Sequence, residues 1–487
     1  MSKPNIIFIL SDDQGAWAMH CAGNEDIITP NLDRIAKNGI RFENFFCASP
    51  VCSPARASIV TGEIPSCHGV IDWLKAGNAN TENHPYMKEH QHFKEKDVGI
   101  EYLEGRPSYI AELAKNGYTC AQSGKWHLGN SEKAKEGFEK WFTIYGGGCG
   151  YYDADTFENG HFTHDKRYVT DIITEKAIEY LDGLSGENSP FYLGVHYTAP
   201  HSPWDEKQHP KEFIDMYRDS EFNATPKEKV HPNQITSCQI GDTEQARKDC
   251  LRGYYAAITA MDYNIGKILD RVEEKGIADN TIIVFMADNG MNLGHHGIWG
   301  KGNGTYPQNM YDTSVKVPLL ISAPFMKNKG IVAENLLSQC DFFPTLMELA
   351  QINYQSTQKQ SGKSFASVLR GDNSSENEFV AVSSEYGSVR MLRNKKRKLV
   401  MCYIDGNHQY FNLENDADEK INLIDNSDYA DEIAQMKLKL EEFFEKYSRD
   451  DFDARKFFVS GSGQLKMCND AKSFSENLVY FDKSRNK

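Results

Sequence analysis

Short hydrophobic runs that end abruptly in polar residues recur along the first two thirds of the chain. Three of them are "NIIFILSDD" at 5–13, "PFYLGVHYTAPH" at 190–201 and "TIIVFMADNG" at 281–290. An apolar run of this length, without strict alternation, predicts a strand that is buried on both faces. Two further runs, at 119–129 and 316–324, fit the same description.

Segments with helical periodicity lie between these runs. "NLDRIAKNGIRF" at 31–42 and "SYIAELAKNGY" at 108–118 carry apolar residues at helical spacing and then a glycine, a usual residue after a helix end. A longer amphipathic stretch covers 254–276. This alternation predicts an α/β fold, in which a large, mostly parallel sheet is sandwiched by helices. Ligands of such sheets bind beyond the carboxyl ends of the strands.

The pattern changes after a polar stretch at 351–364. Four short strand-like segments, separated by brief turns, cover 378–415, and an amphipathic helix is expected at 429–447. They predict a smaller C-terminal antiparallel sheet of about four strands, plus a helix. We therefore expect a large domain at 1–375 and a C-terminal subdomain at 376–487.

Composition and charge exclude several classes of protein. The chain has 487 residues, of which 40% are hydrophobic, and its net charge is −15. This acidity argues against a nucleic-acid binder and against a protein of anionic membrane surfaces, but not against a small anionic ligand. The apolar run in "MSKPNIIFIL" is too short for a signal peptide or a membrane span, so we expect a cytoplasmic location. The 11 scattered cysteines are expected to be reduced.

Acidic residues stand at two of the predicted strand ends. Asp12 and Asp13 follow the first strand, and Asp288 and Asn289 follow the strand at 281–287. Neighbouring carboxylates repel each other unless a cation lies between them, although a single Asp–Asp pair is more often a solvated turn. Four oxygen ligands without an obvious histidine or cysteine partner favour a hard cation, Ca²⁺ or Mg²⁺, over zinc.

A further motif surrounds Cys52, in a chain with no other sign of thiol chemistry. "CSPAR" at 52–56 fits the pattern Cys-x-Pro-x-Arg and continues into "ASIVTG". Together with "SDDQ", "GKWHLG", "APHSP" and "DNGMNLGHHGIWGKG", in this order, it resembles the type I sulfatases of the alkaline phosphatase-like superfamily. The resemblance spans about Asn5 to Pro324, and "YFNLENDADEKINL" at 410–423 is similar to the family's C-terminal segment.

The resemblance implies an unusual role for Cys52. In this family a formylglycine-generating enzyme oxidises the motif cysteine to 3-oxoalanine (formylglycine), and Pro54 and Arg56 belong to the signal that this enzyme reads. One hydroxyl of the hydrated aldehyde attacks the sulfur of a sulfate ester. The second hydroxyl then loses its proton, sulfate leaves and the aldehyde returns. A thiol is therefore not the nucleophile.

The same resemblance assigns the other site residues. Asp12, Asp13, Asp288 and Asn289, with the modified Cys52, match the ligands of a Ca²⁺ ion, with Mg²⁺ as the alternative. The resemblance implies contacts to sulfate or to its leaving oxygen for the remaining positions. These are Arg56 beside the modified residue, Lys125 on sulfate, His127 beside the nucleophile, His201 as the acid for the leaving oxygen and Lys301 between sulfate and that oxygen.

The sequence says less about the substrate, which is expected to be a sulfated small molecule or oligosaccharide. The pattern favours carbohydrate or glycosaminoglycan sulfates over aryl or steroid sulfates. Trp73, Trp204 and Tyr151 are candidate lining residues, and His196 is a further one, although core packing explains them as well. A His- and Lys-rich surface insertion could meet a second anionic group, or could simply be solvated. It contributes His84, Lys88, His90, His92 and Lys94.

Two other functions remain open at this point. The first is a phosphate or phosphonate ester hydrolase of the same superfamily. Two-zinc members typically carry histidine after the strand-end aspartate, where this chain has Asn289, which favours one hard cation. The second is a protein that binds sulfated glycans without turnover. The presence of every expected catalytic residue, Cys52 and His127 above all, argues against it.

Overall fold

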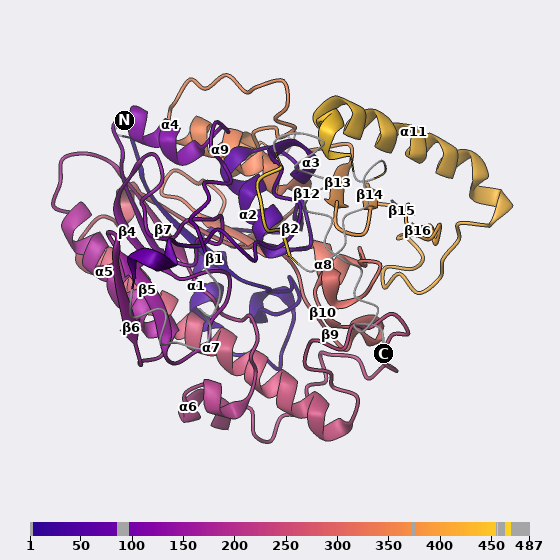
Figure 1. The fold of residues 1–487 in the computed structure, drawn as a ribbon, viewed down its shortest axis with the longest axis horizontal. Coiled ribbons are helices and arrows are strands. Elements are labelled where there is room, and N and C mark those ends of the chain that lie inside the picture. The colour runs from indigo at the N-terminus through magenta and orange to yellow at the C-terminus, as the bar shows by residue number, and fades with distance from the viewer. Residues whose placement is uncertain (1–2, 85–96, 373–375, 454, 456–462, 469–487) are drawn as a thin grey trace.

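A computed structural model describes residues 3–84, 97–372, 376–453, 455 and 463–468 (Figure 1). Its centre is a ten-stranded sheet, which confirms the large sheet that the apolar runs predict. From one edge to the other the strands are β12 (Ile331–Ser338), β2 (Ile40–Phe46), β11 (Leu319–Ser322), β8 (Thr281–Ala287), β1 (Asn5–Ser11), β7 (Phe191–His196), β3 (Thr119–Gly124), β4 (Phe138–Ile144), β5 (Ala154–Glu158) and β6 (His161–Asp165).

The central strands β8, β1, β7, β3 and β4 run parallel, which confirms the expected sheet. Strand β11 is antiparallel to both of its neighbours, and β5 and β6 form an antiparallel hairpin at one edge. The hydrophobic pattern cannot report strand direction, because a strand buried on both faces reads the same either way.

Helices cover both faces of this sheet. Alternate residues of β1 show the two layers, since Phe8 packs into one buried cluster and Ile7 and Ile9 pack into another. The first cluster includes residues of α2 (Cys52–Thr61), α4 (Tyr109–Lys115) and α9 (Phe342–Leu349), and the second those of α1 (Pro30–Lys37), α5 (Val169–Leu184) and α7 (Glu244–Glu274). Figure 1 shows α4 and α9 on the opposite side of the sheet from α7.

The C-terminal part is the predicted antiparallel sheet with one helix. Its strands, in order, are β13 (Val380–Ser384), β14 (Val389–Arg393), β15 (Arg397–Cys402) and β16 (Gln409–Asn412), and α11 (Ala430–Tyr447) packs on them. The boundary at 375 and 376 remains a prediction. Smaller elements complete the fold, namely α3 (Pro65–His68), α6 (Lys211–Asp215), α8 (Asp312–Val315), α10 (Ala366–Leu369), β9 (Asn292–Leu293) and β10 (Trp299–Gly300).

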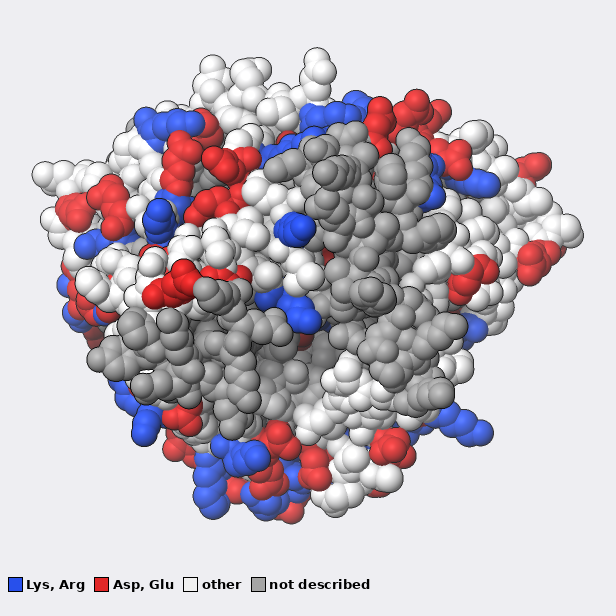
Figure 2. All heavy atoms as spheres, in the orientation of Figure 1, with Lys and Arg blue, Asp and Glu red and all other residues white. Residues whose placement is uncertain are grey.

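Acidic and basic side chains are interspersed over the described residues on the face in Figure 2. Within the described part of the chain, none of the helices combines the length and the hydrophobicity that a membrane crossing needs.

Candidate active site

The two acidic strand ends meet at the carboxyl edge of the sheet. Strands β1 and β8 are parallel neighbours with Ser11 opposite Ala287, so the residues that follow them are also adjacent. The backbone N–H of Asp13 donates to Oδ1 of Asp288 over 3.1 Å. The side-chain amide of Asn289 donates to Oδ1 of Asp13 over 2.9 Å. Asp13 has a left-handed backbone (φ 61°), a conformation that aspartate tolerates better than most residues.

Cys52 reaches the same place from the start of α2. It is the first residue of this fully buried helix, and Arg56 lies one turn further on. Residues four apart share a helix face, so Arg56 also points to the strand ends. Pro54 fits the first turn, where a backbone N–H would have no helical partner. The motif therefore places a thiol and a guanidinium side by side.

Three buried carboxylates pair with three buried cationic side chains. The pairs are Lys125 with Asp12, Lys301 Nζ with Asp13 Oδ1 at 2.5 Å, and Arg56 Nε with Asp288 Oδ2 at 2.8 Å. The side chains alone therefore sum to no net charge. An anionic sulfate ester gains little from a neutral cluster, so an added divalent cation would supply the missing positive charge.

The pKa values of the three carboxyls follow from these surroundings. Burial is the largest influence on Asp12 and raises its pKa, but the charges of Lys125, His201 and Arg56 together outweigh it, so the net shift is downward. Burial also raises the pKa of Asp13, but the charges of Lys301, His201 and Lys125 together lower it, so its pKa falls below the ordinary value. Burial and then the charge of Asp12 raise the pKa of Asp288. A cation between these groups would favour the charged form of all three.

Unpartnered oxygens support a cation at this position. Oδ1 of Asp12 and Oδ1 of Asn289 are buried, and neither has a hydrogen-bond partner in the described part of the chain. One ligand atom each of Asp12, Cys52 and Asp288 lies within 4.8 Å of the others. Burial raises the pKa of the Cys52 thiol, so the unmodified side chain is a neutral thiol and a weak nucleophile. The oxygen-rich set fits a hard divalent cation.

His127 is held as a neutral ring with one free acceptor. It follows β3 in a left-handed conformation (φ 54°), and its Nε2 lies 3.2 Å from the carbonyl oxygen of Leu74. Burial, with Lys125 and Arg56 nearby, holds its pKa well below the ordinary value. Nε2–H therefore donates to Leu74, and Nδ1 is left as an acceptor with no partner among the described residues.

His201 lies on another side of the same cluster. Its Nδ1 donates to the carbonyl oxygen of Ser202 over 2.7 Å, and its Nε2 lies 3.6 Å from Oδ2 of Asp13. The side chain is 28% exposed, more than the other site residues. Nζ of Lys301 lies between Asp13 and Cys52 and is 2.9 Å from Sγ of Cys52. His201 and Lys301 thus approach the same location from two loop segments.

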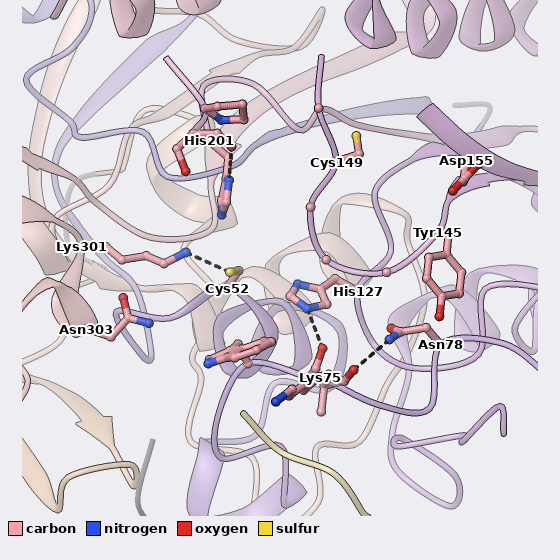
Figure 3. Close-up of a pocket in the computed structure, with 18 of the residues that line it drawn as sticks. Cys52, Lys75, Asn78, His127, Tyr145, Cys149, Asp155, His201, Lys301 and Asn303 are labelled. Carbon is pink, nitrogen blue, oxygen red and sulfur yellow. Dashed lines mark hydrogen bonds between the residues drawn. The ribbon is translucent and has the colours of Figure 1, made fainter. Parts of the chain in front are cut away.

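These groups line a cavity of about 680 Å³ (Figure 3). Cys52, His127, His201 and Lys301 all belong to its lining. The other walls come from residues 73–75 and 78, from the glycine-rich loop at 145–150, and from 153, 155, 202–203 and 303. A cavity of this size holds a molecule of the size of a small saccharide.

The sulfatase family model matches residues 4–352 of this chain, which is most of its length. The chain belongs to the sulfatase family. It is therefore a sulfuric ester hydrolase. A second family model, for the C-terminal part of N-sulphoglucosamine sulphohydrolase, matches residues 294–446 of this sulfatase.

Two curated relatives and one solved structure illustrate its similarities. An N-acetylglucosamine-6-O-sulfatase of Bacteroides thetaiotaomicron is 27% identical over 93% of this chain and 88% of the relative. A choline-sulfatase of Rhizobium meliloti is 29% identical over 87% of this chain and 83% of the relative. A structure solved with its substrate D-glucosamine-2-N,6-O-disulfate has a TM-score of 0.76 at 24% identity. The match covers 93% of this chain and 99% of that structure's chain. The last similarity shows that the fold of the sulfatase is shared.

Of the four predicted lining residues of the sulfatase, Trp73 alone belongs to the described cavity lining. Trp204 is buried and donates from Nε1 to the Pro200 carbonyl over 2.9 Å. The Tyr151 hydroxyl donates to the His201 carbonyl over 2.8 Å. His196 is buried against Phe8, behind the strand ends. Trp204 and Tyr151 thus support the segment that carries His201, which their place in the sequence did not reveal.

The predicted anion-binding insertion is described only in part. His84 contacts Glu132 over 2.6 Å and packs against Phe157, which makes it a structural residue of the sulfatase. Lys88, His90, His92 and Lys94 lie outside the described residues. The sequence reasoning missed other lining residues, namely Lys75, Asn78, Asp153, Asp155 and Asn303. A signal for two of them was present, since Asp153 and Asp155 follow a glycine run; Asp153 lies just before β5 with a left-handed backbone (φ 61°), and Asp155 lies within β5.

Proposed function

We propose that this sulfatase hydrolyses O-sulfate esters of carbohydrates, with formylglycine made from Cys52 by a maturation enzyme. The observation that carries the proposal is the place of Cys52 on the lining of the cavity. There its Sγ contacts Lys301 and lies within 4.8 Å of ligand atoms of Asp12 and Asp288. The Bacteroides relative is named as a sugar 6-O-sulfatase, which supports the carbohydrate class.

The cation is proposed to be Ca²⁺, held by Asp12, Asp13, Asp288 and Asn289. Ca²⁺ accepts an irregular set of oxygen ligands, whereas Mg²⁺ demands near-octahedral geometry and keeps several waters. When bound, the cation polarises the sulfuryl oxygens, and the modified Cys52 supplies a hydroxyl nucleophile. The remaining steps, orientation of the ester and proton transfer, are proposed to depend on side chains of the protein.

Lys125, Lys301 and Arg56 are proposed to orient the ester and the residue at position 52. Each is buried and fixed by a carboxylate, so little reorganisation is needed when charge develops. His127 is proposed to take a proton at Nδ1 from the hydroxyl at position 52. Its neutral state and its unpartnered Nδ1 support this role. His201 is proposed to protonate the leaving oxygen from Nε2.

A panel of esters on matured protein tests this function. The sulfatase is expected to release sulfate from O-sulfated monosaccharides and disaccharides, and far less phosphate or phosphonate from esters of the same alcohols. Higher activity on the phosphorus esters would replace the proposal by the phosphate or phosphonate alternative. Activity confined to aryl or steroid sulfates would keep the chemistry and reject the carbohydrate substrate.

His201→Ala is expected to affect sulfated sugars more than aryl sulfates. A sugar alkoxide leaves poorly without a proton, whereas nitrophenolate leaves well, and general acid catalysis is worth about 10²–10⁴-fold. The loss of kcat should therefore approach this range for a sulfated sugar and be much smaller for 4-nitrophenyl sulfate. Steady-state kinetics on both substrates measure it. Equal losses would remove His201 from the acid role and leave Lys301 as the candidate.

Gly147→Ala is expected to lower kcat by displacing His127. A β-carbon at Gly147 would lie 2.0 Å from Nε2 of His127, too close for the ring to stay in place. A small displacement of a reacting group can cost about 10²-fold in rate. Gly148→Ala is the matched control, because its β-carbon would meet only Cε1 of His201 at 3.7 Å, an ordinary contact. Equal kcat values for the two variants would argue against a role of the His127 ring position.

A further inference from the structure

The cavity wall that faces Lys301 carries the opposite chemistry. Figure 3 shows Asp155, Tyr145 and Asn78 across the cavity from Lys301 and Asn303, with Cys52 between the two sides. We call Asn78, Asp153 and Asp155 the distal wall, since all three belong to the lining. Each of these side chains offers oxygen acceptors to the cavity. Hydrogen-bond acceptors thus line the end of the cavity that lies opposite Lys301.

Asn78 contributes to this wall a buried side-chain oxygen, Oδ1, that has no hydrogen-bond partner within the described segments. The residue is only 5% exposed. Its backbone is fixed, because its N–H donates to Asp97 over 2.9 Å and its carbonyl accepts from Ser131 over 2.7 Å. A buried acceptor without a partner costs free energy unless something binds there. A substrate donor in the cavity would satisfy it.

The two aspartates are aligned by one histidine on the neighbouring strand. His164 of β6 lies opposite Asp155 of β5, and its Nδ1 is 2.8 Å from Oδ1 of Asp155. Its Nε2 is 3.6 Å from Oδ1 of Asp153. Even a protonated His164 would neutralise only one of the two carboxylates. Lys75, the other lysine of the lining besides Lys301, is exposed and lies three residues before Asn78 on the same segment.

We infer that the distal wall binds a hydrogen-bond donor of the substrate, an ammonium or hydroxyl group, and disfavours a second sulfate or a carboxylate there. A sulfate anchored at Cys52 would bring the rest of a small sugar against Asn78 and Asp155. A second anionic group at that position would face two carboxylates, and like charges in contact oppose binding. The enzyme therefore selects monosulfated amino or neutral sugar units. This inference rests on the proposed carbohydrate function.

Three sugars that differ in one group test the inference. Glucosamine 6-O-sulfate carries an ammonium, its N-acetyl form is neutral at that position and its N-sulfo form is anionic. Each is measured as a competitive inhibitor of 4-nitrophenyl sulfate hydrolysis by the matured enzyme. We expect the inhibition constant to rise from the ammonium to the N-sulfo form by about tenfold or more, the scale of one charge contact at a partly exposed site. Asp155→Asn should reduce that ratio severalfold.

Glu139→Gln is the matched control, since it removes one acidic charge from an exposed position of β4 outside the lining. It should keep the wild-type ratio. An N-sulfo sugar that binds as tightly as the ammonium form, or an unchanged ratio in Asp155→Asn, would overturn the inference. If that variant does not fold, the wild-type order of inhibition constants decides. Sulfate release from the same sugars is a separate readout, and its failure would contradict the proposed function instead.

Discussion

Replacing Cys52 with serine is expected to leave the fold intact and to abolish turnover. A serine hydroxyl can keep the contact with Lys301 Nζ, which lies 2.9 Å from Sγ. It lacks the second hydroxyl through which sulfate is released, so the reaction can proceed at most once. We expect a loss of kcat of about four orders of magnitude or more, the scale seen when a nucleophile is removed. Steady-state sulfate release measures it, and circular dichroism and Tm check the fold.

Cys21→Ser is the control for this variant. Cys21 is half-buried and lies outside the cavity lining, so its replacement should leave turnover close to that of the wild type. Full activity of Cys52→Ser would contradict the proposed nucleophile. Loss of activity in both variants would indicate a general effect of losing a thiol rather than a role of position 52.

Asp288→Asn is expected to lose both the divalent cation and most activity. The change removes a charged ligand and the ion-pair partner of Arg56, whose Nε lies 2.8 Å from Oδ2 of Asp288. Removal of one preorganised charge from such a site costs about 10²–10³-fold in rate. Breaking a buried ion pair costs about 3–5 kcal/mol of stability. Metal analysis of the purified protein, kcat and Tm are the measurements.

Asp262→Asn is the matched control, because Asp262 is a buried carboxylate outside this site. It accepts hydrogen bonds from the backbone of Asn31 and Leu32, so the variant should lose stability but keep its cation. For the wild type we expect a chelator to remove activity and Ca²⁺ to restore it. Two zinc ions per active chain, or full activity in the chelator, would contradict a single hard cation.

Much of the fold could be predicted because its signals are local. The apolar runs of β1, β7 and β8 mark buried strands by composition alone, and their polar ends mark the edge where ligands bind. The direction of β11 could not be predicted, since it depends on which neighbours the strand pairs with. The hairpin of β5 and β6 at one edge of the sheet was also missed, because the glycine-rich segment before it resembles an irregular loop.

The residues of the site likewise fall into those that the sequence predicts and those whose role depends on the fold. Asp12, Asp288 and Cys52 stand in contiguous motifs, and the structure brings their ligand atoms together. Trp204 and Tyr151 lie near the motifs in sequence, yet their side chains turn into the layer behind His201. Side-chain direction at such positions depends on tertiary packing, so proximity in sequence does not distinguish a lining residue from a supporting one.

The dependence of activity on Cys52 conversion tests the proposed chemistry most directly. The protein is produced with and without a formylglycine-generating enzyme, and the mass of the peptide that contains Cys52 is compared with sulfate release from a sulfated glucosamine. Conversion of the thiol to the aldehyde lowers the mass by about 18 units. We expect activity to rise in proportion to the converted fraction and to be absent from the folded thiol form. Full activity of protein whose Cys52 remains a thiol would contradict the proposal.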